Sequence, residues 1–276
     1  MKKVAGCFLL FITLSTGLTI SQISTDEMSL SLEKLFGRLR SASEDSVSLR
    51  INDSIKFFID SYVASDRIFT HTFSNLKYLG QITSSDSVIK IVTWNLLLSK
   101  EPGRYFCYFI RKSPEAGTNE VYYLTHGSDD KQILSDTVYS QSDWYGALYY
   151  AIRPFNTDNR KCWVLLGINY SNPLLTRKII EVLSFTQENK LIFGRKWFDS
   201  GKSIYFRHIL EYSASAIISL RFRSDNSIVF DHLVLLPPSG FDDRLYYGPD
   251  YSYDAYIYKN GYWNLSVNID VRNKQK

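Results

Sequence analysis

The stretch Ala255–Val271 reads AYIYKNGYWNLSVNIDV, and its local structure is the most clearly specified in the chain. From Trp263 to its end, apolar residues alternate with polar ones, which is typical of a half-buried β-strand with one wet face. The dipeptide Asn260-Gly261 precedes this run and is the preferred two-residue turn of a β-hairpin. The sequence therefore predicts that Ala255–Tyr258 pairs with the last strand in an antiparallel hairpin.

Several earlier segments also have the composition of strands, because they are rich in β-branched and aromatic residues and are bounded by turn-forming residues. A turn at Ser224–Ser227 joins two of them as a second hairpin, and sequential hairpins imply antiparallel pairing. The predicted strands of this group are Val88–Leu98, Tyr105–Arg111, Glu120–Leu124, Ile217–Phe222 and Ile228–Leu236.

The first part of the chain after residue 21 is predicted to be helical instead. Ser24 and Glu27 fit a capping box, in which each side chain satisfies a free backbone N–H group at the start of a helix. Apolar residues then recur at helical spacing in two stretches, which Ser41–Ser46 separates. Each helix offers one apolar stripe, so both need a surface to pack against. The periodic residues are Leu32, Leu35, Phe36 and Leu39 in the first stretch and Ile51, Ile55, Phe58, Ile59 and Tyr62 in the second.

Two shorter helices are predicted within the strand region. Ser142–Ile152 begins with capping residues and has Trp144 and Leu148 one turn apart, and Leu174–Leu183 follows an Asn-Pro breaker. We therefore expect an α+β fold, with an N-terminal helical pair followed by a mostly antiparallel β-sheet domain with short helical insertions. The expected organisation is a signal peptide at 1–21, a helical N-terminal region at 22–85 and a β-rich domain at 86–276.

The first residues predict export. Lys2 and Lys3 form a basic start, Val4–Ile20 carries no charge, and Ser21 offers a small residue for cleavage. A retained anchor is the competing interpretation, but a spanning helix needs about 20 predominantly apolar residues, and this run is shorter and diluted by Ser and Thr. Cys7 lies in a stretch that resembles a lipidation motif, yet it precedes the apolar run instead of following it. We expect a periplasmic or extracellular protein with no stable membrane span after cleavage.

Composition argues against nucleic acid as a partner. The formal net charge is +4, and two of the positive charges belong to the predicted signal peptide. The remaining basic residues are scattered, whereas a nucleic-acid surface needs a basic stripe. The chain is also rich in aromatic residues, with 20 tyrosines, which suit both strands and surfaces that are partly apolar and partly wet.

After cleavage, Cys107 and Cys162 are the remaining cysteines. A disulfide between them is possible in an oxidising compartment. Both, however, lie inside apolar runs that are typical of buried strands, where a free cysteine behaves as a small apolar residue. The sequence therefore favours two buried free thiols and leaves the disulfide as the alternative.

Chemistry is poorly marked in the sequence. The histidines have no metal-ligand spacing, no glycine loop suits a phosphate, and no serine-nucleophile motif is present, so neither a metal nor a cofactor is predicted. Asp231 and His232 form the most suggestive pair. Because neighbours on a strand point to opposite faces, a structural role is favoured for both. Glu211 lies beside hydroxyl residues, but nothing marks it as activated.

The most unusual stretch is Tyr246–Tyr256, in which tyrosines surround two carboxylates and a Gly-Pro turn. One interpretation is a sugar-binding platform, with tyrosine faces against the sugar rings and carboxylates on their hydroxyls. A second is a calcium loop, although the spacing of an EF-hand is missing. The third, which we favour, is a structural turn followed by a strand that the tyrosines help to pack. The candidate binding residues are Tyr247, Asp250, Tyr251, Tyr253 and Asp254.

Roughly residues 85 to 265 contain a series of motifs that resemble an uncharacterised family of exported proteins of anaerobic Gram-negative bacteria. The resemblance implies export and a setting in a Gram-negative envelope, and it implies no catalytic residue. The motifs that carry it are Thr93-Trp94-Asn95, Trp163–Gly167, Lys178–Phe185, Phe193-Gly194, Glu211-Tyr212-Ser213, Ile228–Leu233 and Tyr246–Asp250.

The predicted function is that of an exported non-catalytic protein, which serves as a structural, binding or accessory component of the envelope or periplasm. Its partner would be a glycan or another envelope protein. The alternative is a carbohydrate-active enzyme or glycan-binding module, because a glycosidase needs only two carboxylates across a cleft and leaves no sequence motif. The candidate carboxylates for this alternative are Glu211, Asp231, Asp250 and Asp254.

Overall fold

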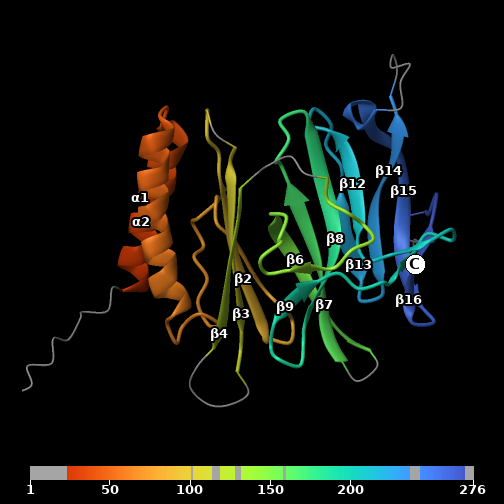
Figure 1. The fold of residues 1–276 in the computed structure, drawn as a ribbon, viewed down its shortest axis with the longest axis horizontal. Coiled ribbons are helices and arrows are strands. Elements are labelled where there is room, and N and C mark those ends of the chain that lie inside the picture. The colour runs from red at the N-terminus through yellow and green to blue at the C-terminus, as the bar shows by residue number, and fades with distance from the viewer. Residues whose placement is uncertain are drawn as a thin grey trace, which may run out of the picture.

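The computed structural model describes residues 24–100, 102–113, 119–127, 132–157, 160–236 and 243–270. Within these residues, a helix pair and three β-sheets stack as four layers, with the helices at one end of the stack and the C-terminal strands at the other (Figure 1). The predicted α+β class with mostly antiparallel sheets is confirmed, although strands dominate. No helix in this part of the chain is long and apolar enough to cross a membrane.

The first layer consists of α1 (Thr25–Ser41) and α2 (Asp45–Val63). The predicted capping box is present, because the Ser24 hydroxyl accepts from the backbone N–H of Glu27 at 3.2 Å and the Glu27 carboxylate accepts from that of Ser24 at 3.2 Å. The predicted apolar stripes face the first sheet and form with it the first hydrophobic core.

The first sheet is antiparallel and has the strand order β1-β2-β3-β4. Its central strands are covered on both faces, since Trp94 and Phe106 pack toward the helices while Ile91 and Phe109 pack toward the second sheet. The strands are β1 (Gly80–Thr83), β2 (Ile89–Leu96), β3 (Arg104–Arg111) and β4 (Glu120–Gly127). The predicted helical region 22–85 therefore also includes β1, which pairs with β2.

The second sheet lies in the middle of the stack and has the order β5-β9-β8-β7-β6. The long strand β8 has two partners along one edge: β12 pairs with it up to Ile180, and β9 pairs with it from Leu183. The change of partner leaves a gap beside Glu181. The strands are β5 (Tyr139–Ser140), β6 (Leu148–Thr157), β7 (Arg160–Asn169), β8 (Leu175–Phe185), β9 (Leu191–Phe193) and β12 (His208–Ser213).

The third sheet has the order β11-β10-β16-β15-β14-β13, and its β10–β16 pair is parallel. Both predicted hairpins are present in it, and the turn between β15 and β16 has Asn260 at φ 55° and Gly261 at φ 83°, as the Asn-Gly signal predicts. The elements are β10 (Phe198–Asp199), β11 (Ile204–Tyr205), β13 (Leu220–Ser224), β14 (Ser227–Leu235), the short helix η1 (Arg244–Tyr246), β15 (Tyr247–Lys259) and β16 (Tyr262–Ser266).

The two predicted helical insertions are wrong. Ser142–Ile152 forms a turn that leads into β6, because Gly146 at φ 78° ends any helical path. Leu174–Leu183 lies almost entirely in β8, which is buried on both faces. A strand covered on both sides reads as a continuous apolar run, so its apolar residues also match helical spacing by chance.

The last strand is shorter than predicted, since β16 ends at Ser266. The chain leaves the sheet because Asn268 adopts φ 54° and its backbone N–H donates to the Asp254 carboxylate at 3.1 Å. Val271, the last residue of the predicted strand, lies outside the described residues, as does the predicted signal peptide at 1–21.

Cys107 and Cys162 are both free and buried. Cys107 packs in the core between the first and second sheets, and Cys162 packs in the core between the second and third. Burial raises the pKa of Cys162 to about 11 and that of Cys107 well above its usual range. The predicted buried thiols are therefore confirmed, and the alternative of a disulfide is wrong.

Candidate functional site

A polar cavity of about 490 Å³ lies between strand β12 of the second sheet and strands β14 and β15 of the third. We call it the arginine cavity. Its lining residues come from β11, β12, β14, β15, β16, η1 and the segments that precede β5 and β12. They are Gln132, Ile133, Ser135, Tyr205, Arg207, His208, Ile209, Leu210, Glu211, Phe230, His232, Leu233, Arg244, Asp254 and Leu265.

An imidazole–carboxylate pair forms one wall of this cavity. His232 Nδ1 lies 2.7 Å from Asp254 Oδ2, and the Asp254 carboxylate also accepts from the backbone of Asn268. Asp254 is buried, whereas the His232 side chain is 33% exposed and reaches solvent. The pair therefore offers the cavity an oriented imidazole whose second nitrogen is available to a ligand.

A β-bulge opposite His232 shapes the same wall. Asp231 pairs with Tyr253 and Leu233 pairs with Pro249, so His232 faces three residues of β15. The extra residues bulge outward, and Tyr251 at their tip has φ 71° and is 92% exposed. The bulge brings the Asp250 carboxylate close enough to His232 for an electrostatic contact.

A second histidine lies deeper in the wall. The His208 ring packs against Phe230 and Tyr256, and its Nδ1 lies 3.2 Å from the Tyr256 hydroxyl. Burial lowers the pKa of His208 to about 4, with Asp254 opposing that shift. The ring is therefore neutral near pH 7. Its Nε2 is shielded from solvent and has no hydrogen-bond partner among the described residues.

On the opposite side of the cavity, one charged group is paired with an opposite charge and another is not. Glu211 accepts from Arg177 Nε at 2.5 Å, and the Arg177 side chain is only 6% exposed. Arg244 is exposed and lies over the Tyr247 ring at 4.4 Å. The cavity thus combines a neutralised carboxylate with a cation that no described acidic group pairs.

Beneath the cavity, Arg207 fills the gap between β9 and β12. Its Nε donates to Glu181 Oε2 at 2.6 Å, and both side chains are fully buried. Glu181 also accepts from the Tyr145 hydroxyl at 2.9 Å, and Arg207 donates to backbone carbonyls of Thr137 and Phe193. The network satisfies both buried charges, which makes it a rigid floor.

The structure brings some of the predicted site residues together and separates the others. Glu211 and Asp254 line the arginine cavity. Asp231 does not, because its carboxylate accepts from the backbone N–H of Ser219 at 2.6 Å on the other face of β14. Asp231 and His232 therefore lie on opposite faces of β14, as expected of neighbours on a strand.

The tyrosine-rich stretch mostly has a structural role. Tyr247 packs against the third core, and Tyr253 pairs in the sheet beside the bulge. The Asp250 carboxylate accepts from the backbone and hydroxyl of Ser252, which stabilises the bulge. Among the described residues, no group of three His, Cys, Asp or Glu side chains is close enough to hold a metal ion.

Sequence reasoning did not find Arg207, His208, Arg244 or Tyr205 as site residues. Arg207 and His208 are neighbours in the sequence, and a positively charged residue beside a histidine at the start of a strand is their only signal. Their importance arises from the partner change along β8, which depends on pairing across the sheet.

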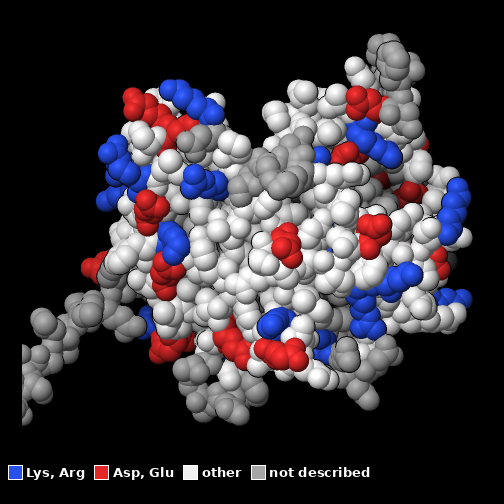
Figure 2. All heavy atoms as spheres, in the orientation of Figure 1, with Lys and Arg blue, Asp and Glu red and all other residues white. Residues whose placement is uncertain are grey.

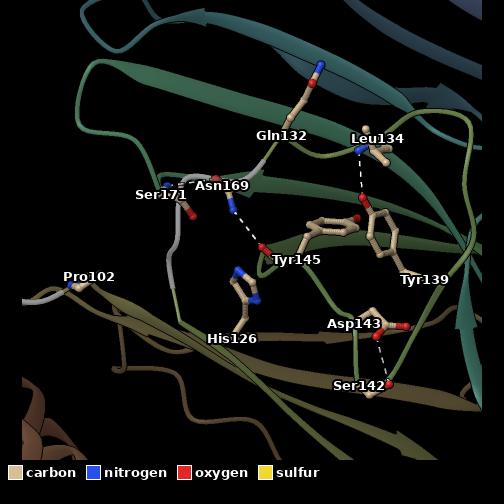
Figure 3. A pocket seen from close by; sticks show the side chains of 10 residues that line it. All are labelled: Pro102, His126, Gln132, Leu134, Tyr139, Ser142, Asp143, Tyr145, Asn169 and Ser171. Atoms are coloured by element: carbon tan, nitrogen blue, oxygen red, sulfur yellow. Dashed lines mark hydrogen bonds between the residues drawn. The ribbon is translucent and has the colours of Figure 1, made fainter.

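A second cavity, of about 650 Å³, lies between the first and second sheets. We call it the tyrosine cavity. Figure 3 shows the side chains of His126, Tyr145 and Asn169 gathered around it from three different segments, with Tyr139 and Asp143 on another side. The remaining lining residues are Pro102, Gln132, Leu134, Ser142 and Ser171.

These features define a class of protein in structural terms: an α/β/β/β layered sandwich with two cavities beside its middle sheet. Comparisons with protein-family models, with curated proteins and with solved structures give no match.

Proposed function

We propose that the protein is an exported, non-catalytic binding component of a Gram-negative envelope or periplasm, and that it binds a hydroxyl-rich ligand of the glycan type in the arginine cavity. The observation that carries the proposal is the mixed chemistry of this cavity. It presents hydrogen-bond acceptors from Glu211, Asp254 and the second ring nitrogen of His232, a donor from Arg244, and the aromatic ring of Tyr205. Sugar hydroxyls both donate and accept hydrogen bonds, so they match such a surface.

The charge distribution supports a neutral ligand over a highly charged one. Within the cavity, the Arg207–Glu181 and Arg177–Glu211 pairs cancel, which leaves Arg244 and Asp254 as one further charge of each sign. On the face drawn in Figure 2, Lys and Arg side chains are interspersed with Asp and Glu and do not gather in a patch. A polyanionic ligand needs concentrated positive charge instead. The predicted signal peptide supports the exported setting.

A glycoside hydrolase is the second candidate, because Glu211 and Asp254 border the same cavity. A general acid in such an enzyme is a carboxyl group whose pKa is raised so that it carries a proton. Here Glu211 lies against a guanidinium, while Asp254 accepts from a backbone N–H and contacts an imidazole. Both carboxylates thus already accept hydrogen bonds from groups of the protein, so neither is placed as a free proton donor. The geometry therefore supports binding more than hydrolysis.

Binding to a saccharide panel tests the proposal. We expect the wild-type protein to bind at least one neutral oligosaccharide, measured by isothermal titration calorimetry, and to release no reducing sugar from it. Arg244→Ala removes a donor from the cavity rim without opening the core, and the loss of a charged hydrogen bond is expected to lower the affinity about ten-fold or more. Arg38→Ala, which alters an exposed arginine of α1, is the matched control and should bind like the wild type.

Two results would contradict the proposal. Failure of the wild type to bind any saccharide in the panel would reject glycan binding. Catalytic release of reducing sugar that is lost in Glu211→Gln would favour the hydrolase in its place.

A further inference from the structure

The segment Gln132–Ser135 lies between the two cavities. Gln132 lines both of them, Ile133 and Ser135 line the arginine cavity, and Leu134 lines the tyrosine cavity. The segment therefore contributes residues to both cavities, while Ile133 also belongs to the core between the first and second sheets. The cavities are neighbours that share a wall one extended segment thick.

The same buried pair, Arg207 and Glu181, contacts residues of both cavities. Arg207 lines the arginine cavity, and its guanidinium lies 4.6 Å from the ring centre of Tyr139 and 5.7 Å from that of Tyr145, which line the tyrosine cavity. Arg207 also donates to the carbonyl of Leu134 in the shared wall. Glu181 holds the guanidinium from below and accepts from Tyr145. The two floors are thus parts of one preformed network, which lowers the cost of ordering the site on binding.

The tyrosine cavity has the same kind of chemistry as its neighbour. The Asp143 carboxylate accepts from the Ser140 hydroxyl at 2.6 Å and from that of Ser142 at 3.3 Å, and these bonds hold the pKa of Asp143 below its usual range. Asn169 is oriented by a bond from its amide to the Gly146 carbonyl at 2.7 Å. The cavity therefore contains fixed acceptors and tyrosine rings, as a sugar subsite does.

We propose that the two cavities are subsites of one elongated binding site, and that its ligand is a linear oligosaccharide which crosses the shared wall at Gln132. This inference rests on the proposed function of the arginine cavity and extends it to the length of the ligand. Each volume, about 490 and 650 Å³, is within the range of a complete ligand site of about 300–1,000 Å³, so both subsites accept sugar units at once. The shared Gln132 amide can donate to one unit and accept from the next.

The test compares short and long ligands on the full chain. The probes are maltose with maltohexaose and chitobiose with chitohexaose, with affinities measured by isothermal titration calorimetry. A hexasaccharide that fills both subsites is expected to bind at least ten-fold more tightly than the corresponding disaccharide.

Variants separate the two subsites. Asp143→Asn is expected to weaken binding of the hexasaccharide about ten-fold and to leave the disaccharide, held in the arginine cavity, unchanged. Arg244→Ala should weaken both. Asp53→Asn makes the same chemical change on the exposed side of α2 and should alter neither. Thermal unfolding of each variant checks that the fold is retained.

The outcomes distinguish the elongated site from the proposed function itself. If disaccharide and hexasaccharide bind equally, or if Asp143→Asn leaves the hexasaccharide affinity unchanged, the elongated site is wrong while glycan binding in the arginine cavity stands. If no saccharide of either length binds, the proposed function is rejected and this inference falls with it.

Discussion

Lys90 is the most unusual single residue outside the cavities. Its side chain is buried between α2 and the first sheet at 1% exposure, and its ammonium donates to the Tyr62 hydroxyl at 2.9 Å and to the Thr72 hydroxyl at 3.3 Å. It also donates to the carbonyl of His71. These are neutral partners, and burial lowers the pKa of Lys90 from 10.5 to about 8.

The lowered pKa predicts that Lys90 contributes more stability in alkaline than in neutral solution. The unfolded chain binds the Lys90 proton more tightly than the folded one, so the Lys90 contribution to the free energy of unfolding falls as the pH drops from 10.5 to about 8. The full difference is about 3 kcal/mol. Urea unfolding of wild type and Lys90→Met across this range checks it, since the variant should lose this pH dependence. An identical pH dependence in both proteins would show that Lys90 is not its source.

The Glu181–Arg207 pair predicts a large loss of stability when one charge is removed. Glu181→Gln leaves the guanidinium buried without a counter-charge, and breaking such a pair costs about 3–5 kcal/mol. The double variant Glu181→Gln/Arg207→Met removes both charges and should recover part of that loss. Denaturant unfolding of the two variants measures the difference. If the double variant is the less stable of the two, Arg207 acts mainly through the backbone carbonyls that it bonds.

Of the individual residues that line the arginine cavity, the sequence predicted only some. Glu211 and Asp254 were both candidates for the carboxylate pair of a glycosidase, and Asp254 also belonged to the tyrosine-rich stretch; both line the arginine cavity. Arg207 and His208 could not be found in this way. Their side chains meet Glu181 and Tyr256 only after β8, β12 and β15 have assembled, and no local spacing encodes that meeting.

Among the elements, β8 explains both the success and the failure of sequence-based prediction. Strands with one wet face, such as Tyr262–Ser266, alternate visibly and were recognised. Leu175–Phe185 is covered on both faces, so its apolar residues form a run without alternation that also fits a helix. The helix pair was predicted well because its capping box and apolar stripe are local signals.

Gly194 follows β9 and lies against Arg207, which fills the gap between β9 and β12. It has φ 106°, and a Cβ atom there would lie 2.7 Å from Arg207 Nη2 and 3.1 Å from the Thr137 carbonyl. Gly194→Ala is therefore expected to destabilise the protein by about 1–3 kcal/mol and to displace Arg207. Gly201→Ala is the matched control, because Gly201 also has a positive φ of 80° but nothing within 4 Å. Equal melting temperatures for the two variants would contradict the close packing.

For the whole molecule, the middle sheet is the common wall of two cores. Leu165 packs toward the first sheet, while Val164 and Leu166 pack toward the third. A sheet covered on both faces ties the layers together, so loss of one core exposes the back of the next. The layers are therefore expected to unfold as one cooperative unit.

The two thiols report on this cooperativity, since Cys107 and Cys162 lie in different cores. Neither should react with a thiol reagent in the native protein, because both are buried with raised pKa values. Both should become reactive at the same urea concentration. Mass spectrometry of labelled peptides measures the two transitions separately. Labelling of Cys162 well before Cys107 would show that the third sheet detaches first.

The parallel pair β10–β16 has a consequence for biosynthesis. Phe198 pairs with Trp263, which is made 65 residues later, and β15 obtains its second neighbour only from the same late strand. Contacts so distant in sequence raise the contact order and slow folding. A ribosome-bound chain that lacks β16 cannot close the third sheet, so this sheet stays incomplete until Tyr262–Ser266 has been made and has left the ribosome.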